Sequence, residues 1–311
     1  MARSYGWPLA VLALALLFPR IAAAFGQEFY VGFATRILIM ALFASSLNLL
    51  VGLGGMVSMG HAAFFGTGAY VVGMMSAGWG ATGENALLVW PMAMLASALL
   101  ALVVGAVSLR TKGVYFIMIT LAFAQMLFYF FVSLKTYGGD DGMSLARRSN
   151  LVGLDLGSDP IFYYVVLALF AMSMLLFGRL AAARFGNVLR GIKDNEIRME
   201  SLGYAVFRYK LAAFVIAAAF AGLAGALMAN QNNFVSPNML FWDQSATALV
   251  MVILGGLGSL WGGLAGAALL LALEELLSGI TGHWPIVLGV ILLGVVFFAP
   301  NGIMGLLARR R

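Results

Sequence analysis

The chain of 311 residues contains no cysteine, and Asp, Glu, Lys and Arg together make up only 10% of it. The lack of cysteine excludes disulfides, thiolate nucleophiles, iron–sulfur clusters and thiolate zinc sites. Only two histidines are present, His61 and His283, and neither belongs to a carboxylate–histidine cluster with metal-ligand spacing. The glycine-rich stretches lack the Lys-Ser/Thr of a phosphate-binding loop. We therefore expect no metal, no cofactor and no ATP hydrolysis by this chain.

What the chain has instead is apolar sequence: 63% of its residues are hydrophobic and its mean hydropathy is +0.99. Several apolar runs reach the length of about 20 residues that a helix needs to cross the hydrocarbon core. The sequence predicts an all-α fold, a polytopic transmembrane helical bundle of about 8–10 membrane segments, with residues 1–311 forming a single domain. Spans are predicted near residues 7–25, 30–51, 60–80, 86–109, 114–134, 161–180, 211–230 and 284–300.

The apolar stretch 244–278 is too long for one crossing. Its "GGLGSLWGG" (255–263) predicts a turn between two short helices, because glycine runs interrupt helices at low steric cost. Two short spans and a re-entrant segment both fit this pattern.

The charges separate between the two ends of the predicted spans. The end with residues 184–210 carries 13 of the 18 basic residues, and the end with residues 135–160 carries nine of the 12 acids. Cationic loops stay cytoplasmic, so we expect both termini and residues 184–210 to be cytoplasmic and residues 135–160 to be extracytoplasmic. The first span follows Arg3 and ends in "IAAA" (21–24), which also fits a secretory signal. An uncleaved first span fits the alternation of loops better.

Residues 184–210 hold six cations and three acids in an otherwise apolar chain. Projected as one helix, residues 187–203 place Val188, Ile192, Asn195, Met199 and Leu202 on one apolar stripe. Ile197 lies among charges on the opposite face, and Gly203 ends the helix. The segment is either a charged loop that only sets topology or a helix that docks a cytoplasmic partner through mixed charges and one apolar anchor.

This segment also carries a family resemblance. "RGIKDNEIRMESLGYAVFRYKLAAFVIAAAFAGLAGAL" (190–227) resembles the coupling region of permease subunits of ABC importers for branched-chain amino acids, the LivM type. Two further stretches match, "SLNLLVGLGGMVSMGHAAFFGTGAYVVGMM" (46–75) and "VMVILGGLGSLWGGLAGAALL" (251–271), and "GGDDGM" (138–143) is similar to a loop motif of the family. Compared with the broader importer consensus, Ile197 and Arg198 replace two alanines.

The resemblance implies a permease domain in the bacterial cytoplasmic (inner) membrane, coupled to an ATPase on another chain. The implied partners are two cytoplasmic ATP-binding subunits, a second related permease, an extracytoplasmic substrate-binding protein and the lipid bilayer, with no nucleic acid. Residues implied to couple to the ATPase are Arg190, Lys193, Asp194, Glu196, Ile197, Arg198, Glu200 and Gly203. The acids of the 135–160 loop either help to dock the binding protein or form a solvated loop. The substrate is a branched-chain amino acid or a related solute such as another amino acid, urea or a short amide.

A candidate translocation segment is "GLGGMVSMGHAAFFGTGAY" (52–70), which combines glycines with small polar residues. Irregular backbone is tolerated at membrane depth only where it is buried or lines a cavity. We therefore predict that Asn48, Ser58, His61 and Thr67 line the path. Close helix packing through small residues is the alternative.

Ionisable residues inside membrane spans are costly, so they pair, snorkel or face water. Arg36 and the Glu274–Glu275 pair fall in this class, and the polar Gln125 carries the same ambiguity. The rival function is a secondary transporter or channel with ion coupling through Arg36, His61 or the Glu274–Glu275 pair, which would work without an ATPase and would leave residues 184–210 unexplained. A membrane enzyme would need a polar cluster near one interface, and the sequence shows none.

Overall fold

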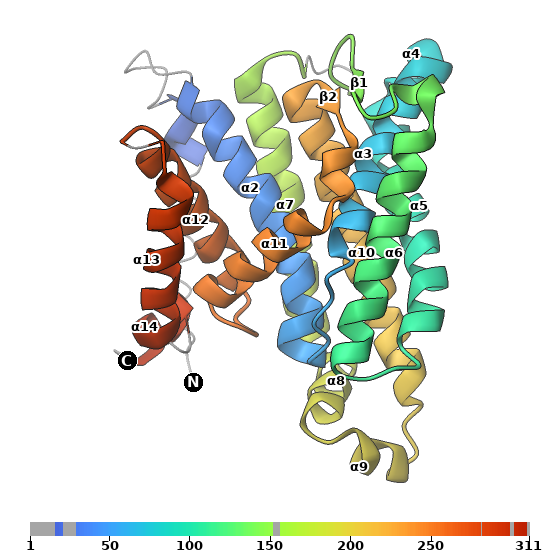
Figure 1. Cartoon of the computed structure of the whole chain (residues 1–311), viewed down its shortest axis with the longest axis vertical. Helices are drawn as coiled ribbons and strands as arrows, with labels where there is room; N and C mark the ends of the chain where they lie inside the picture. The colour runs from blue at the N-terminus through green and yellow to red at the C-terminus, as the bar shows by residue number, and fades with distance from the viewer. Residues whose placement is uncertain (1–15, 21–28, 152–155, 281, 299–301, 310–311) are drawn as a thin grey trace.

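A computed structural model describes residues 16–20, 29–151, 156–280, 282–298 and 302–309 (Figure 1). Its helices are α2 (Phe29–Asn48), the π-helix η1 (Leu49–Leu53), α3 (His61–Gly78), α4 (Gly80–Gly83), α5 (Ala86–Ser108), α6 (Val114–Ser133), the 3-10 helix η2 (Lys135–Tyr137), α7 (Asp159–Ala182), α8 (Arg184–Asp194), α9 (Glu196–Ser201), α10 (Val206–Asn232), the 3-10 helix η3 (Pro237–Leu240), α11 (Trp242–Gly255), α12 (Gly262–Ser278), α13 (Trp284–Phe298) and α14 (Gly302–Arg309). One antiparallel pair of short strands, β1 (Met143–Ser144) and β2 (Phe234–Val235), joins two loops.

The all-α membrane bundle that the sequence predicts is confirmed. Within the described residues, five helical segments are long and apolar enough to cross a membrane: Phe29–Leu53, Ala86–Ser108, Val114–Ser133, Asp159–Ala182 and Val206–Asn232. The shorter helices α3, α11, α12 and α13 join the same bundle. The predicted span 7–25 lies outside the described residues except for the helical stretch 16–20.

The bundle is built around α2 and α10. In the most apolar 18-residue part of each segment, 83% of the residues are buried in Phe29–Leu53 and 72% in α10, compared with 22% in α6. Helix α10 packs against α3, α5 and α2, and α2 also contacts α7 and α12. Helices α5 and α6 form one side of the molecule and α12 and α13 the other (Figure 1). Apolar side chains of α6 therefore face outward, as they do in a lipid-facing helix.

The two ends of the bundle differ in content. Helices α8 and α9 project from one end, next to the turn that joins α5 to α6 (Figure 1). At the opposite end lie α4, the β1–β2 pair and residues 134–151 (Figure 1). The loops thus alternate between the ends as the charge pattern predicts. Which end faces the cytoplasm stays a prediction.

The helical path breaks between α2 and α3. After the π-helix η1, residues 55–60 are non-helical, and Met56, Ser58 and Gly60 are buried. Several backbone N–H groups of this stretch find acceptors: Met56 N–H donates to the Leu50 carbonyl at 3.1 Å, and Met59 N–H donates to Thr120 Oγ1 at 3.3 Å. At the start of α3, Ala62 N–H donates to Ser245 Oγ of α11 at 2.7 Å. Irregular backbone is tolerated here because neighbouring helices satisfy it.

The second break is the predicted glycine turn between α11 and α12, which is confirmed. Gly256 and Gly258 have φ of 113° and 74°, conformations that side chains with a Cβ rarely adopt. Helix α12 packs along α11 and returns to the end of the bundle where β2 lies (Figure 1). Residues 242–278 therefore form a hairpin of two packed helices, which fits both two short spans and a re-entrant segment.

The two breaks touch each other at Gly52 and Gly258, which yields a first prediction. A Cβ on Gly52 would lie 2.6 Å from Gly258 Cα and 2.7 Å from Asn48 Oδ1. Both distances are shorter than a normal van der Waals contact, and the Gly258 backbone would have to move to relieve the first. We expect Gly52→Ala to destabilise the protein by about 1–3 kcal/mol, the usual cost of overpacking. The measurement is the thermal unfolding midpoint of the purified protein. Gly78→Ala is the matched control, because a Cβ there meets nothing within 4 Å. Equal midpoints for the two variants would contradict this contact.

Candidate coupling site and translocation segment

The charged segment is two helices and not the single helix over 187–203 that the sequence predicted. Helix α8 ends at Asp194, and Asn195 adopts an extended conformation with φ −157° and ψ 102°. The Asn195 side chain then accepts a hydrogen bond from Arg198 N–H at 3.0 Å, which caps α9. Asparagine is a preferred N-cap because its oxygen satisfies a free N–H of the first turn. The break at Asn195 overrides the apolar periodicity.

The break changes which side chains face the bundle. Val188 and Ile192 are buried and Met199 is half-buried, as predicted. Asn195 and Leu202 were expected on the same stripe, but both are exposed because α9 departs from the axis of α8. Ile197 points outward as predicted and is 72% exposed. An exposed isoleucine among charges is a suitable anchor for a partner.

Gly203 ends the second helix in a Schellman motif. Its φ is 85°, its N–H donates to the Glu200 carbonyl at 2.9 Å, and Tyr204 N–H donates to the Met199 carbonyl at 3.1 Å. This pair of bonds defines the motif, and glycine takes the left-handed conformation without steric cost. The glycine predicted to end the helix does so.

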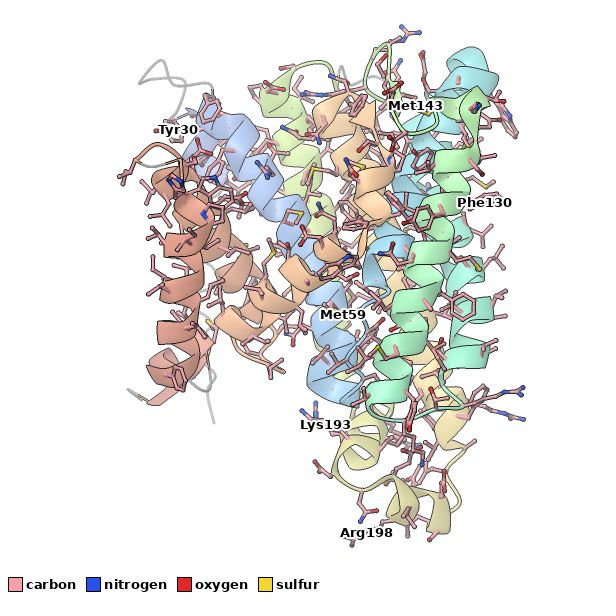
Figure 2. All side chains as sticks on the ribbon, viewed as in Figure 1. Tyr30, Met59, Phe130, Met143, Lys193 and Arg198 are labelled. Atoms are coloured by element: carbon pink, nitrogen blue, oxygen red, sulfur yellow. The ribbon has the colours of Figure 1, made fainter. Side chains whose placement is uncertain are left out.

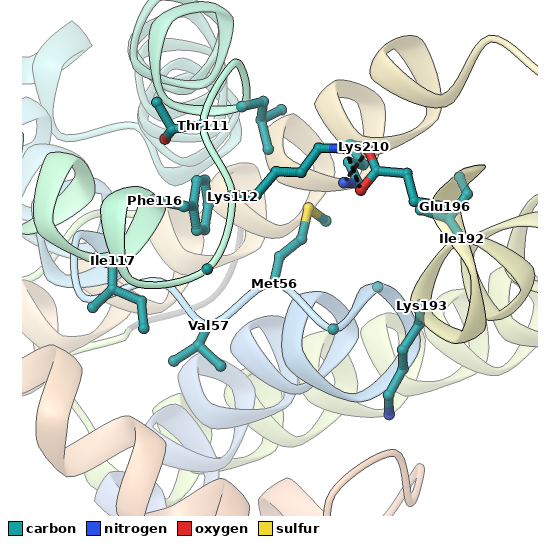
Figure 3. Close-up of a pocket in the computed structure, with 14 residues that line it drawn as sticks. Met56, Val57, Thr111, Lys112, Phe116, Ile117, Ile192, Lys193, Glu196 and Lys210 are labelled. Carbon is teal, nitrogen blue, oxygen red and sulfur yellow. Dashed lines mark ion pairs between the residues drawn. The ribbon is translucent and has the colours of Figure 1, made fainter. Parts of the chain in front are cut away.

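Glu196 ties the segment to the bundle. Its carboxylate pairs with Lys210 Nζ of α10 at 2.8 Å and with Lys112 Nζ, in the turn between α5 and α6, at 3.3 Å (Figure 3). Burial alone would raise the pKa of Glu196, but the hydrogen bonds and charges of Lys210 and Lys112 outweigh it and hold the pKa below its ordinary value. The sequence did not identify these two partners of Glu196, because Lys112 lies 84 positions before it and Lys210 lies 14 positions after it.

Lys193 makes a second tie. Its Nζ donates to the carbonyl of Gly52, at the end of η1, at 3.0 Å. In Figure 3 the Lys193 side chain points away from the Glu196 ion pairs, and both line a cavity of about 220 Å³ between α8, α9 and residues 54–57. A lysine near a helix C-terminus satisfies one of its free carbonyls. Lys193 therefore joins α8 to the first helix break.

The other predicted coupling residues are exposed. Arg190 donates to Asn187 Oδ1 at 3.0 Å and to the Ala181 carbonyl, so it braces α8 against the end of α7. Asp194, Arg198 and Glu200 lie on the outer surface and, within the described part of the chain, have no ion-pair partner. Their free charges face away from the bundle (Figure 2 labels Arg198 at this end).

Asn48, a predicted path residue, clamps the glycine turn onto α2. Its Nδ2 donates to the Ser259 carbonyl at 2.7 Å, and its Oδ1 accepts from Gly258 N–H at 2.9 Å. Both halves of one buried amide therefore satisfy backbone groups of the α11–α12 turn.

The remaining predicted path residues also have partners inside the bundle. Ser58 Oγ accepts from Gly60 N–H at 3.3 Å, and Thr67 Oγ1 donates to the Ala63 carbonyl at 2.7 Å. His61 is fully buried, and its Nε2 lies 2.8 Å from Ser46 Oγ. Ser46 Oγ also lies 2.7 Å from the Phe43 carbonyl, and within the described residues His61 Nδ1 has no hydrogen-bond partner. Their lining of a path stays a prediction.

The loop between α6 and α7 is organised by Arg148, a residue that the sequence did not single out. Arg148 donates to the carbonyls of Asn230, Leu156 and Gly157, pairs with Asp159 at 2.6 Å, and lies over the ring of Phe162. Its neighbour Ser149 donates its N–H to Asn230 Oδ1 at 2.6 Å. Asp140 and Asp141 stay exposed, whereas Asp155 lies outside the described residues.

The Glu196 ion pairs predict a pH dependence. Because the folded pKa of Glu196 is lowered, its pairs stabilise the segment above the unfolded pKa and are lost as pH falls through the folded value. We expect amide protection over residues 196–204 to be constant near neutrality and to fall below about pH 4.3. Glu196→Gln should lower protection roughly two- to tenfold already at pH 7, as expected for two partly exposed pairs. Hydrogen exchange measures this.

Glu200→Gln is the control for that experiment. It removes a carboxylate one turn away, in the same helix, that has no ion-pair partner. Equal loss of protection in both variants at pH 7 would show that the two lysines do not hold the segment.

Comparisons with known proteins agree with this architecture. Residues 29–299 match the family model described as branched-chain amino acid transport system / permease component. The chain is 30% identical to the high-affinity branched-chain amino acid transport system permease protein LivM of Salmonella typhimurium and of Escherichia coli, over 95% of this chain and 74% of each relative. It is 26% identical to a probable LivM of Methanocaldococcus jannaschii, over 54% of this chain and 50% of that protein. No solved structure matches the chain. The chain therefore belongs to the family of branched-chain amino acid transport permeases.

Proposed function

We propose that the chain is the membrane-spanning subunit of an ATP-driven importer for branched-chain or related amino acids, powered by an ATPase on a separate polypeptide. The observation that carries this proposal is the α8–α9 segment. It projects from one end of the bundle, it is tied at its base by Lys193 and Glu196, and it presents Ile197 and unpaired charges outward. A loop that only sets topology needs none of these ties.

These contacts suggest how a movement of the α8–α9 segment would be transmitted to the bundle. Arg190 connects α8 to α7, Lys193 connects it to η1, and Glu196 connects α9 to α10 and to the α5–α6 turn. Movement of the segment by a docked ATPase would therefore act on four places of the bundle at once. One of them is the break between α2 and α3, where non-helical backbone and the α11–α12 turn meet. In this mechanism the break changes between states that the substrate distinguishes.

The same proposal assigns sides and partners. The α8–α9 end is cytoplasmic, because it carries most of the cations, and it receives one of two ATPase subunits. The opposite end, with exposed Asp140 and Asp141, receives the extracytoplasmic binding protein. A second related permease completes the pathway in the cytoplasmic membrane.

Ile197 gives the direct test of docking. A carboxylate at this exposed position should prevent an apolar anchor from entering a partner's cleft, so we expect Ile197→Asp to lose at least about 90% of a co-purifying ATPase. The measurement is the amount of nucleotide-binding subunit recovered with the tagged chain after gentle solubilisation from its native host. Arg110→Asp is the control, because it adds the same carboxylate to an exposed residue at the same end but outside the segment.

Recovery of no ATPase with the wild type, together with amino acid transport by the chain alone, would favour a secondary transporter. Recovery that is equal for all variants would leave residues 184–210 as a topology loop.

Lys193 gives the test of coupling as distinct from docking. Lys193→Met keeps the long side chain but removes the bond to the Gly52 carbonyl, a charged hydrogen bond of about 1.5–3 kcal/mol. We expect the ATPase to stay bound while ATP-driven uptake in proteoliposomes falls at least about tenfold. Arg184→Met, an exposed cation at the start of α8, should leave uptake within about twofold of wild type. Normal uptake by Lys193→Met would exclude this contact from the coupling route.

A further inference from the structure

A polar cavity lies at the end of the bundle opposite α8 and α9. It has a volume of about 380 Å³ and is lined by Phe29, Gly32, Phe33, Arg36, Asp159, Gln231, Asn232 and Glu275. These residues come from α2, the start of α7, the end of α10 and the last turns of α12. Pockets for small molecules are typically about 300–1,000 Å³, so this one has room for a small solute.

Two opposite charges line this cavity without pairing. Arg36 lies two turns into α2, and Glu275 lies in the last turn of α12. Across the described residues neither side chain has an ion pair or a hydrogen-bond partner. The third charge, Asp159, is already neutralised by Arg148 at 2.6 Å. The cavity thus holds one free cation and one free carboxylate, separated from each other.

A further acceptor near these charges is also unused. Gln231 Oε1 is buried and has no hydrogen-bond partner, while its Nε2 donates to the Gly32 carbonyl at 3.4 Å. Gln231 lies in the last turn of α10, where the free carbonyls of the helix end make the site favourable for a cation. Buried polar atoms without a partner are rare, and each needs an explanation such as an absent ligand.

We propose that this cavity receives the zwitterionic end of an α-amino acid on its way into the permease. Arg36 binds the carboxylate, and Glu275 with Gln231 Oε1 binds the ammonium group. Phe33 and Phe29 stand on the same face of α2 as Arg36, one and two turns away respectively, and contact an aliphatic side chain. The assignment rests on the proposed function in its choice of substrate.

The charge pattern selects the ligand class. A site for an anion would have an excess of cations, and a site for a cation would have an excess of acids. Here the free charges cancel, so a neutral molecule with separated charges is the complementary ligand. Both side chains are exposed to the cavity, and urea or a simple amide would leave them without ionic partners, whereas a zwitterion pairs with both.

The experiment uses the importer assembled from this chain, its partner permease and the ATPase subunits in nanodiscs, without the binding protein. Equilibrium binding of radiolabelled leucine is measured, with leucinamide and 4-methylpentanoate as competitors that lack the carboxylate and the amine. We expect Arg36→Gln and Glu275→Gln each to weaken leucine binding at least about tenfold, the effect of losing one charged hydrogen-bonded pair. Arg36→Lys should retain binding within about fivefold.

The controls are Lys135→Gln and Glu274→Gln, which remove charges at the same end that do not line the cavity. Both should bind leucine as wild type does. In the wild type leucinamide should compete at least about tenfold more weakly than leucine, and Arg36→Gln should abolish that preference. If Arg36→Gln fails to assemble, 4-methylpentanoate decides the case: it should compete at least about tenfold more weakly than leucine in the wild type, and Glu275→Gln should abolish that preference.

Two results would overturn the proposal, and they differ. Unchanged leucine binding in Arg36→Gln and Glu275→Gln, with normal ATP-driven leucine uptake, removes this site and leaves the proposed function intact. An assembled importer that hydrolyses ATP but neither binds nor takes up amino acids removes the proposed substrate, and the site with it.

Discussion

The structure depends on one constraint: inside the bilayer every backbone N–H and carbonyl must find a partner in the protein. This chain breaks its helices twice at membrane depth, after η1 and between α11 and α12. Each break is supported by the other elements. Thr120 and Ser245 accept from the backbone around residues 59–62, and the Asn48 amide bonds both Gly258 and Ser259. The close approach of Gly52 to Gly258 makes these bonds possible, because any side chain at Gly52 would hold the two breaks apart.

The same constraint explains why the charged segment connects to the bundle where it does. A helix that ends inside a protein leaves carbonyls without partners, and the Gly52 carbonyl is one of these. Lys193 satisfies it from outside the membrane region. The connection joins α8 to η1, and η1 carries the glycine that contacts the second break. Packed interfaces of this kind switch between discrete arrangements more readily than they deform.

Patterns within a few residues predicted much of this architecture, whereas contacts between residues far apart in the sequence were not predicted. The spans, the glycine turn at 255–263, the outward Ile197 and the terminating Gly203 follow from patterns within a few residues. The prediction of a single helix over 187–203 was wrong, because the preference of Asn195 for a helix N-cap outweighed the helical spacing of the apolar residues. The lysines that hold Glu196 and the many partners of Arg148 were not predictable, since bonds between residues 84 or 82 positions apart depend on the tertiary fold. The sequence assigned Asn48 to a path, but only the structure shows its two backbone bonds.

The two arginines at the acidic end of the bundle show how structure separates a supporting charge from an available one. Arg148 is surrounded by three carbonyls, a carboxylate and an aromatic face, so its charge is fully engaged in holding the loop between α6 and α7. Arg36 has none of these partners among the described residues, and its side chain is exposed two turns into α2. A charge in a membrane span without a protein partner faces water or solute. Glu275 and Gln231 line the same cavity, and within the described residues the Glu275 carboxylate and Gln231 Oε1 also have no partner, so three available polar groups share one cavity.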